Sequence, residues 1–494
     1  MFDLTELLKS TTVKKTSPFA NISIGGIKYD SRTVGQGELF IAIKGFKTDG
    51  HQFIDKAIAN GAVAIVIENE SFSTDKCPWI LVENGRTALA DLSAAFYNYP
   101  SRELILIGVT GTNGKTTTAN LIAKIFADQG HKIGLIGTIH NRIGDKILPG
   151  ERTTPESSDL QYLFKEMLAD GVGVVVMEVS SHALDLERVR GCDFDVAVFT
   201  NLTQDHLDYH QTMEEYYQAK AKLFINLVNR DSRRKDKFAV INGDDPWGQK
   251  LLADTRVKVL SYGIAGNVSL KAENIKVTSA GVNYQIQDNC LKLKLTGKFN
   301  VYNSLAALAV AVGKGIPISR AAASLEEVAG IPGRFQLVQG AEDFAVIVDY
   351  AHTPDSLINI LTTARELTAG RIITVFGCGG DRDRTKRPLM GKAAARYSDY
   401  CIVTSDNPRT EDPRTIIRDI LPGLEEVAGE EKYRVMADRK KAIQEALQIA
   451  RKGDSVIIAG KGHETYQEIN GEKYPFDDKA IAEEILKNMN KATS

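Results

Sequence analysis

Short, uninterrupted runs of apolar residues recur along the chain and are separated by helical segments. From residue 104 onward these runs are 104–109, 173–179, 196–201, 345–349, 371–376, 400–404 and 455–459. Runs of this kind are typical of parallel strands covered by helices on both faces. We therefore predict an α/β protein with doubly wound parallel sheets, in which ligands lie at the carboxyl ends of the strands.

Two clusters of turn-forming residues divide the chain. One is Asn98-Tyr99-Pro100-Ser101 and the other is Gly330-Ile331-Pro332-Gly333. Glycine and proline in such clusters interrupt both helices and strands. We predict a smaller α/β domain over residues 1–102, a P-loop-type doubly wound domain over 103–332, and a Rossmann-like domain over 333–494.

Composition narrows the class of protein. The chain has 61 Lys and Arg against 63 Asp and Glu, and this net charge of −2 argues against a dedicated nucleic-acid binder. No apolar run approaches about 18 residues, so no membrane span is expected. The N-terminus lacks the basic and apolar segments of a signal peptide. Five widely spaced cysteines without a CxxC pair fit a reducing compartment, and we expect a cytoplasmic protein.

A glycine-rich loop follows the run 104–109 and opens a helix at 117–129. Glycines let backbone N–H groups approach phosphate oxygens, and the helix N-terminus adds partial positive charge. Lys115 can reach the β- and γ-phosphates, and the Thr116 hydroxyl can ligate Mg²⁺. The strict P-loop spacing is not met, because Val109 occupies the first glycine position. The predicted ATP phosphate site comprises Gly111, Thr112, Asn113, Gly114, Lys115, Thr116 and Thr117.

This loop variant resembles that of the Mur ligase superfamily, which also includes folylpolyglutamate synthases and forms amide bonds with ATP through an acyl phosphate. The resemblance implies that Glu178 and His206, each just past an apolar run, bind Mg²⁺ together with Thr116. From the residues alone, Glu178 could instead cap a helix and His206 could be an ordinary loop histidine. The resemblance also implies that Lys220 is carbamylated (N6-carboxylysine) and helps to hold a second Mg²⁺, although its pattern alone indicates a solvated helical lysine. The expected catalytic residues are Lys115, Glu178, His206 and Lys220.

Further positions resemble the nucleotide site of the family. Asn300 and Asn303 offer amide donors and acceptors that suit an adenine edge, although Asn300 could also be a helix cap. In the family, the residues matching Arg334 and Asp349 meet phosphate and nucleotide. A site shared by two domains implies that the domains close on binding.

A third group of matches concerns a uridine nucleotide. Tyr29-Asp30-Ser31-Arg32 resembles a uridine-nucleotide segment that folylpolyglutamate synthases lack. Arg152 stands where some relatives carry Asn, and we assign it no role. The residues implied to bind UDP-MurNAc-L-Ala-D-Glu are Ser31, Thr153, Thr154, Ser180 and Arg188.

Three segments that follow strands in the last domain carry charges suited to a small polar ligand. Arginine can clamp a carboxylate bidentately, which lysine cannot, and Asp406 or Glu464 can accept from an ammonium group. A meso-diaminopimelate presents both groups at its far end. In the family, Asp-Asn-Pro-Arg marks the diaminopimelate-adding enzymes, whereas Asn407-Pro408 alone could be a simple turn. The predicted site is Arg382, Asp406, Asn407, Pro408, Arg409, Gly460 and Glu464.

The resemblance thus implies an ATP- and Mg²⁺-dependent ligase of peptidoglycan precursor synthesis, which we expect to act as a monomer on UDP-MurNAc-L-Ala-D-Glu, meso-diaminopimelate and ATP. The nearest alternative is a lysine-adding or other ligase of the same fold. A GTPase-like switch would need an Asn-Lys-x-Asp motif, which the sequence lacks. A binding module without catalysis is disfavoured by the intact phosphate loop. His352 is a candidate base for the attacking amine, although a supporting hydrogen-bonding role is favoured.

Overall fold

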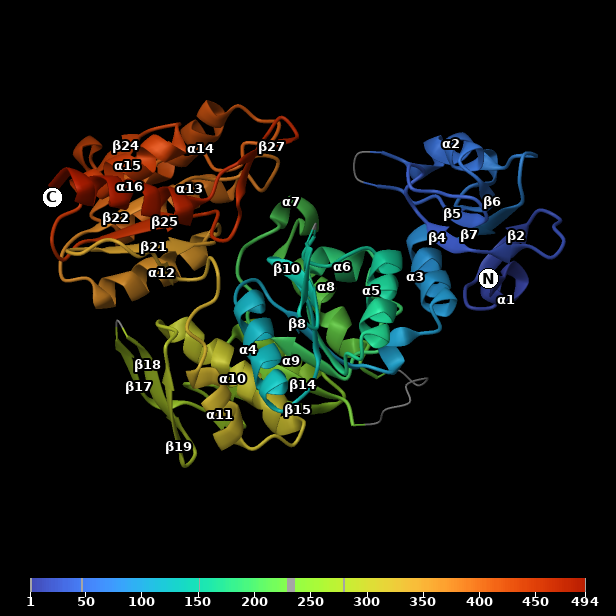
Figure 1. Ribbon diagram of the computed structural model, residues 1–494, viewed down its shortest axis with the longest axis horizontal. Coiled ribbons are helices and arrows are strands. Elements are labelled where there is room, and N and C mark those ends of the chain that lie inside the picture. Colours follow the sequence, from blue (N-terminus) through green and yellow to red (C-terminus); the bar gives the residue numbers. More distant parts are fainter. Residues whose placement is uncertain (1, 46–47, 151, 229–235, 279, 494) are drawn as a thin grey trace.

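The computed structural model describes residues 2–45, 48–150, 152–228, 236–278 and 280–493. Figure 1 shows three bodies, each built around one sheet: the N-terminal part at upper right, the central part below, and the C-terminal part at upper left. None of the helices in these described residues is long and apolar enough to cross a membrane.

The N-terminal body has a five-stranded mixed sheet in the order β2-β7-β6-β5-β4. Helices α1 and α3 cover one face and α2 the other, because apolar residues alternate between the two faces of each strand. A separate short ladder pairs β1 (Phe2–Asp3) with β3 (Ser23–Ile24). The main elements are β2 Val13–Thr16, β4 Gly26–Lys28, β5 Glu38–Ile41, β6 Ala62–Ile67, β7 Trp79–Val82, α1 Leu4–Leu8, α2 Ile54–Ala59 and α3 Gly85–Phe96.

The central body has a nine-stranded sheet in the order β11-β10-β9-β12-β8-β13-β14-β15-β16, parallel from β9 to β16. Helices α4, α10 and α11 pack on one face, and α5, α8 and α9 on the other. Its strands are β8 Ile105–Thr110, β9 Ile133–Ile136, β10 His140–Ile143, β11 Lys146–Pro149, β12 Val174–Glu178, β13 Val196–Phe199, β14 Phe238–Asn242, β15 Lys258–Gly263 and β16 Leu270–Lys271. Its helices are α4 Lys115–Asp128, α5 Ser157–Ala169, α6 Ser181–Asp185, α7 Leu207–His210, α8 Met213–Ile225, α9 Pro246–Asp254, α10 Lys298–Gly313 and α11 Ile318–Glu326.

The C-terminal body has a six-stranded sheet in the order β20-β21-β25-β22-β23-β24, in which β20 alone is antiparallel to its neighbour. Helices α12, α13 and α14 pack on one face, and α15 and α16 on the other. Its strands are β20 Gln336–Leu337, β21 Ala345–Asp349, β22 Ile372–Phe376, β23 Tyr400–Val403, β24 Tyr433–Val435 and β25 Ser455–Ala459. Its helices are α12 Pro354–Leu367, α13 Lys386–Tyr397, α14 Pro413–Glu425, α15 Arg439–Ile449 and α16 Asp478–Thr493.

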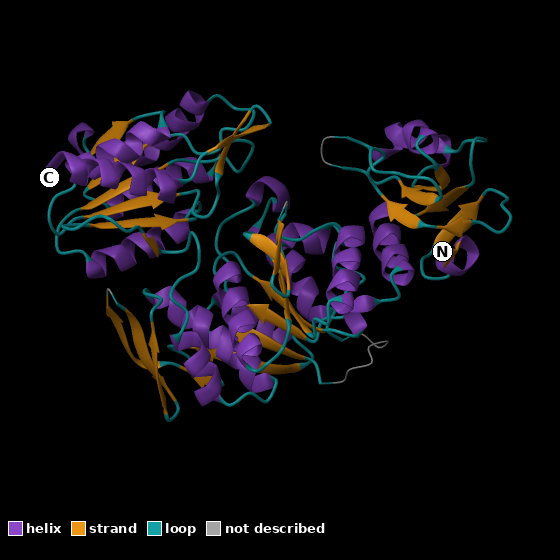
Figure 2. Ribbon diagram, viewed as in Figure 1, coloured by secondary structure: helices purple, strands orange, loops and turns teal. Residues whose placement is uncertain are grey.

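The predicted α/β class with doubly wound, mainly parallel sheets is confirmed in both larger bodies (Figure 2). The strands predicted at 345–349 and 455–459 match β21 and β25. Among the antiparallel features that were not predicted are a three-stranded sheet of β17 (Glu273–Thr278), β18 (Gly281–Ile286) and β19 (Asn289–Leu293), and a hairpin of β26 (Tyr466–Ile469) and β27 (Glu472–Pro475). Both contain many exposed polar positions, so they lack the continuous apolar runs of buried strands.

The central and C-terminal bodies meet closely at the turn around residue 333. Gly333 has φ of +67°, and a Cβ at this position would overlap the backbone of His463. The Gly333 carbonyl also accepts from the Tyr350 N–H at 2.9 Å. Glycine is therefore needed here both for the backbone conformation and for the close packing of this turn against the loops at 350 and 463 of the C-terminal body.

Candidate active site

The phosphate loop lies in the middle of the central sheet, because β8 runs between β12 and β13. Its backbone is held from β13: Thr112 N donates to Asn201 O and Asn113 N to Asn201 Oδ1, both at 2.9 Å. Gly111 has φ of +150°, and a Cβ there would overlap the Thr200 hydroxyl. This explains why the loop departs from the strict motif. The packing that leaves no room for a side chain occurs at position 111 and not at the first glycine position of that motif.

Two lysines share one carbonyl beneath this loop. Lys115 Nζ and Lys220 Nζ each donate to Gly111 O at 2.9 Å. Lys220 comes from α8 and is only 2% exposed, so the pattern-based interpretation of a solvated lysine is wrong. Burial lowers the pKa of both amines, and the charge of Lys115 lowers the pKa of Lys220 further. A neutral amine is the form that can react with carbon dioxide.

Glu178 closes β12 with its carboxylate inside the cavity rather than on a helix. Its Oε2 accepts from the Thr116 and Thr138 hydroxyls at 3.0 Å, and its Oε1 accepts from Thr138 N at 2.9 Å. The helix-cap alternative is wrong, because Ser180 caps α6 by accepting from Ala183 N. Glu178 is almost fully buried, and its contact with Thr116 places its carboxylate at the phosphate end of the cavity.

His206 lies across the same cavity, at a backbone φ of +56° that starts α7. Its Nε2 lies 3.3 Å from Asp205 Oδ2. Burial lowers the pKa of His206 to about 3, so the imidazole is neutral near pH 7 and free to ligate a metal. The pKa of Asp205 is held well below its usual value by His206, Lys386 and His352, although burial alone would raise it.

The donor set fits Mg²⁺ better than a metal held by protein groups alone. In the part of the chain that the structure describes, no group of three or more His, Cys, Asp or Glu side chains could hold a metal ion. Thr116 and Glu178 supply oxygen atoms next to the phosphate loop. Mg²⁺ usually takes one or two such protein ligands and completes its shell with phosphate oxygens and water.

A cavity of about 940 Å³ joins the central and C-terminal bodies around these groups. The structure brings sixteen of the predicted residues to its wall. They are Thr112, Asn113, Gly114, Lys115, Thr116, Thr153, Thr154, Glu178, Ser180, Arg188, His206, Lys220, Arg334, Asp349, Arg382 and Arg409.

Contacts across the two bodies close this cavity. Arg334 Nη2 donates to Thr116 Oγ1 at 3.0 Å. Asn113 Nδ2 donates to Asp355 Oδ2 at 2.8 Å. Asp349 supports Arg334 by accepting from Phe335 N at 2.6 Å, and burial raises the pKa of its carboxyl group. The phosphate loop is therefore held by groups from the C-terminal body as well as from its own sheet.

The predicted diaminopimelate residues form a compact polar cluster at the other end. Asn407 Nδ2 donates to Glu464 Oε2 at 2.7 Å, and Lys461 Nζ donates to Asn407 Oδ1 and Glu464 Oε2 at 3.0 and 3.1 Å. Burial and then Asp406 raise the pKa of Glu464. A Cβ on Gly460 would lie 2.5 Å from Asp406 Oδ2, which explains the glycine.

Most of this cluster lies behind the cavity wall rather than in it. Asp406 and Asn407 are buried, Pro408 packs its carbonyl against Gly380, and the wall is formed by Arg382 and Arg409. The sequence alone assigns no role to Lys461, although it lies between the predicted residues Gly460 and Glu464. Lys461 is fully buried between two polar partners. This burial depends on contacts with distant parts of the chain, so the local sequence does not reveal it.

Outside the diaminopimelate cluster, five predicted residues do not line the cavity: Gly111, Thr117, Asn300, Asn303 and Ser31. Asn300 and Asn303 are buried and their amides are used internally, since Asn300 Nδ2 donates to Thr296 O at 2.8 Å and Asn303 Nδ2 to Asn300 Oδ1 at 3.0 Å. Asn303 also touches the phosphate loop, because its Oδ1 accepts from the Thr118 hydroxyl at 3.3 Å. Ser31 is buried in the N-terminal body, where its carbonyl accepts from Asn60.

His352 lines the cavity but is poorly suited to be a base. Its Nδ1 lies 2.8 Å from Tyr350 O, and its Nε2 lies 4.0 Å from Asp205 Oδ2. Burial lowers the pKa of His352 to about 4. A base this weak takes a proton from an ammonium group inefficiently, which favours the supporting role.

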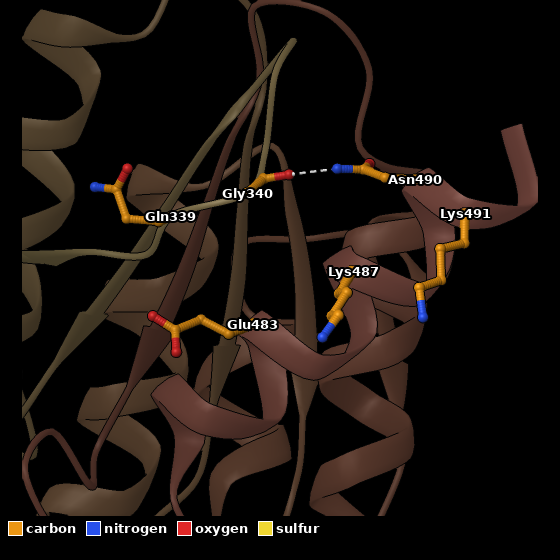
Figure 3. Close-up of a pocket in the computed structure, with 6 residues that line it drawn as sticks. All are labelled: Gln339, Gly340, Glu483, Lys487, Asn490 and Lys491. Atoms are coloured by element: carbon orange, nitrogen blue, oxygen red, sulfur yellow. Dashed lines mark hydrogen bonds between the residues drawn. The ribbon is translucent and has the colours of Figure 1, made fainter. Parts of the chain in front are cut away.

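A second hollow lies on the outer face of the C-terminal body, between the loop after β20 and helix α16 (Figure 3). It is lined by Gln339, Gly340, Glu483, Lys487, Asn490 and Lys491, and Asn490 Nδ2 donates to Gly340 O at 3.0 Å. It contains no residue predicted to bind substrate. The candidate active site is therefore the cavity between the bodies.

The fold and this cavity define a class: a multidomain α/β nucleotide-binding protein whose phosphate loop faces an arginine-lined pocket on its C-terminal body. Family models match three segments: "Mur ligase family, catalytic domain" over 23–97, "Mur ligase middle domain" over 109–311, and "Mur ligase, glutamate ligase domain" over 333–462. The chain belongs to the Mur ligase family.

Individual relatives match over nearly the whole chain. The UDP-N-acetylmuramoyl-L-alanyl-D-glutamate–2,6-diaminopimelate ligase of Geobacillus thermodenitrificans (strain NG80-2) is 50% identical over 94% of this chain and 96% of its own length. The enzyme of the same name from Syntrophomonas wolfei is 46% identical over 98% of this chain and 99% of its own. A solved structure with that name has 35% identity and a TM-score of 0.65, and covers 94% of this chain and 95% of its own.

Proposed function

We propose that this protein is the ATP-dependent ligase that joins meso-2,6-diaminopimelate to the D-glutamate of UDP-MurNAc-L-Ala-D-Glu. The observation that carries this proposal is one cavity containing both the phosphate loop around Lys115 and the arginine of the Asp-Asn-Pro-Arg segment, Arg409. The first group of residues suits ATP and the second suits a ligand with a distal carboxylate. Relatives over nearly the whole chain carry that activity in their names.

The reaction proceeds in two steps. The free γ-carboxylate of D-glutamate attacks the γ-phosphorus of ATP, which gives an acyl phosphate and releases ADP. The diaminopimelate amine then attacks the acyl carbon, loses a proton, and the phosphate leaves. The protein mainly positions these groups and balances their charge.

The phosphate end supplies positive charge and oriented donors. Lys115 exchanges the Gly111 and Thr112 carbonyls for phosphate oxygens, and Arg334 lies 3.0 Å from Thr116 Oγ1, where it can meet the same phosphates. Thr116, Glu178 and His206 are the residues suited to hold Mg²⁺. Bound there, Mg²⁺ neutralises negative charge on the phosphoryl groups.

Lys220 belongs to this end as a carbamate. The buried amine of Lys220 is unfavourable in its charged form, because it lies next to the cation of Lys115. An anionic carbamate on Lys220 would attract Lys115 instead of repelling it. The carbamate oxygens would be a further ligand for Mg²⁺. The depressed pKa of Lys220 supports this assignment, because the neutral form is the reactive one.

The uridine-nucleotide substrate enters from the N-terminal side. Thr153, Thr154, Ser180 and Arg188 line the cavity on that side, and Thr154 Oγ1 donates to Glu178 O at 2.9 Å. Burial lowers the pKa of Arg188. We propose that Ser31 reaches the nucleotide when the N-terminal body, residues 1–102, swings toward the cavity.

The remaining assignments follow from this function. Residues 103–332 bind ATP, with Asn300 and Asn303 turned toward the adenine only after rearrangement, and residues 333–494 bind diaminopimelate through Arg382, Asp406, Asn407, Pro408, Arg409, Gly460 and Glu464. All five cysteines are unpaired, which supports a cytoplasmic location. We propose that the protein works as a monomer.

A single assay tests this function. Phosphate release is measured with ATP, Mg²⁺ and UDP-MurNAc-L-Ala-D-Glu, and with either meso-diaminopimelate or L-lysine as the second substrate. We expect rapid release with diaminopimelate and little with lysine, because lysine lacks the distal carboxylate. Turnover with lysine but not diaminopimelate would assign the protein to a lysine-adding ligase.

A further inference from the structure

The hairpin β26–β27 belongs to the C-terminal body, where β27 is labelled in Figure 1. It lies against the segment 406–409 at the amino-acid end of the cavity, since Arg409 bridges Ile469. Glu468 N donates to Asn407 Oδ1 at 2.9 Å. The backbone of Arg409 pairs with the hairpin in both directions, because its N–H donates to Glu468 O at 3.0 Å and its carbonyl accepts from Asn470 N at 2.7 Å. The hairpin is therefore built onto the residues that read the ligand.

These bonds hold Arg409 in an unusual conformation. Its φ is +52°, in the left-handed region that a residue with a Cβ adopts only when its surroundings require it. Asn470 and Gly471 form the hairpin turn, with φ of +52° and +83°. The turn sets the register of the hairpin, which pairs Glu468 with Lys473. The bridge between Arg409 and Ile469 then places residue 468 beside Arg409.

The side chain of Glu468 then meets the guanidinium group. Its Oε2 lies 3.2 Å from Arg409 Nε, and Arg409 Nη1 donates to Gly380 O at 2.8 Å. Both side chains are largely buried and line the cavity. The protein thus contacts the guanidinium at Nε and Nη1, and neither of these two contacts uses Nη2, which can face a ligand.

Judged by charge alone, Glu468 would weaken the binding of a ligand carboxylate. Burial lowers the pKa of Arg382, and repulsion from the nearby Arg409 lowers it further. The carboxylate of Glu468 counteracts this by raising the pKa of Arg382. A carboxylate here also repels a ligand carboxylate, so deleting it would strengthen binding if charge dominated. Orientation is expected to win, because an arginine binds a carboxylate well only when its planar fork is fixed.

We propose that Glu468 is a positioning residue for the diaminopimelate site, with its carboxylate holding the Arg409 guanidinium in the orientation that receives the distal carboxylate of the ligand. This inference rests on the proposed function. Glu468 itself does not touch the reacting atoms. It sets the affinity for the amino acid without affecting the phosphate end of the cavity.

The test compares steady-state constants of four variants with those of the wild type. Glu468→Ala removes the contact, Glu468→Gln keeps its length and an acceptor oxygen but not its charge, and Glu468→Asp keeps the charge but is too short. The control is Glu472→Ala on the other strand, since the Glu472 carboxylate is exposed and accepts from the Tyr474 hydroxyl of its own strand. Thermal unfolding midpoints establish that each variant is folded.

We expect Glu468→Ala to raise the KM for diaminopimelate about tenfold, the loss typical of a charge-assisted contact, with the KM for ATP and kcat within about twofold. Glu468→Gln should recover most of the affinity, Glu468→Asp should not, and Glu472→Ala should match the wild type. A lower or unchanged KM for diaminopimelate in Glu468→Ala overturns the proposal. So does an aspartate variant that outperforms the glutamine variant, a comparison that holds even where the alanine variant fails to fold.

The wild-type protein separates this inference from the proposed function. Turnover of the wild type with diaminopimelate upholds the function whatever the variants do. A wild type that turns over only with lysine contradicts the function, and it overturns the inference as well, since no distal carboxylate would then be read.

Discussion

The phosphate end of the cavity is built around one continuous loop at the tip of β8, whereas the amino-acid end is assembled from loops after β22, β23 and β25 together with the hairpin β26–β27. The backbone of the first loop is held by Asn201, just past the neighbouring strand β13. The second end consists of side chains that bond to each other, such as Lys461, Asn407 and Glu464. A loop of the first kind can be recognised in sequence and reused for many substrates, whereas an assembly of the second kind sets which substrate is taken.

The strongest test of this division removes charge from the phosphate end. Lys115→Ala should lower kcat by about 10³-fold or more, because the side chain balances charge on the transferring phosphoryl group. Lys124→Ala is the matched control, since Lys124 lies on the same helix but pairs with Asp128 at the surface. Phosphate release measures both. A small loss in Lys115→Ala, equal to that of the control, would contradict the assignment of this loop.

A second variant tests the chemical state of the phosphate end. Lys220→Ala should lower kcat about 100-fold, and a short carboxylic acid such as acetate or formate should restore part of it by taking the place of the carbamate. Lys222→Ala, an exposed neighbour on α8 that pairs with Asp185, is the control. Wild-type activity in Lys220→Ala that no added bicarbonate or short acid affects would refute the carbamate.

At the amino-acid end the expected effect is on affinity. Arg409→Lys should raise the KM for diaminopimelate about 10- to 100-fold while leaving the KM for ATP unchanged, because lysine cannot reproduce the planar fork. Arg384→Lys serves as the comparison, since Arg384 pairs with Asp419 at the surface. An unchanged KM for diaminopimelate would refute the clamp.

The smallest effect is expected from an ion pair that joins the two ends of the cavity. Lys386 on α13 and Asp205 beside His206 form a buried ion pair between the bodies, with Nζ and Oδ1 3.4 Å apart. Lys386→Met should weaken closure and raise the KM of both ATP and diaminopimelate about three- to tenfold together. Lys392→Met on the same helix, whose partner Glu426 is exposed, should change neither. A rise in only one KM would mean that the ends close independently.

The same division explains what the sequence could predict. The phosphate loop and the parallel sheets could be predicted because their signals are local, a glycine pattern and an apolar run, whereas the role expected of Glu178 came from the resemblance to a family. The burial of Lys220 and the roles of Lys461 and Glu468 depend on contacts with residues far away along the chain. No spacing rule reports such contacts. The resemblance to a family supplied Lys220, and only the structure supplied the other two.

Two antiparallel features were missed for a related reason. The hairpin β26–β27 has no continuous apolar run, and its Asn470-Gly471 turn is the one local signal that pointed to it. The sheet β17–β19 alternates exposed and buried residues around the central core. For Asn300 and Asn303 the prediction of an adenine contact stays a prediction, because their amides are bonded internally in this conformation.

The position of β8 in the middle of its sheet has a consequence for synthesis on the ribosome. The loop at 111–114 emerges early, but the groups that complete it come much later: Asn201 beside it, Asn303 beneath it, and Arg334 across the hinge. A nascent chain should therefore carry a complete-looking phosphate motif long before it can retain a nucleotide. Fragments that end before α10 should fail to bind ATP, however intact their motif.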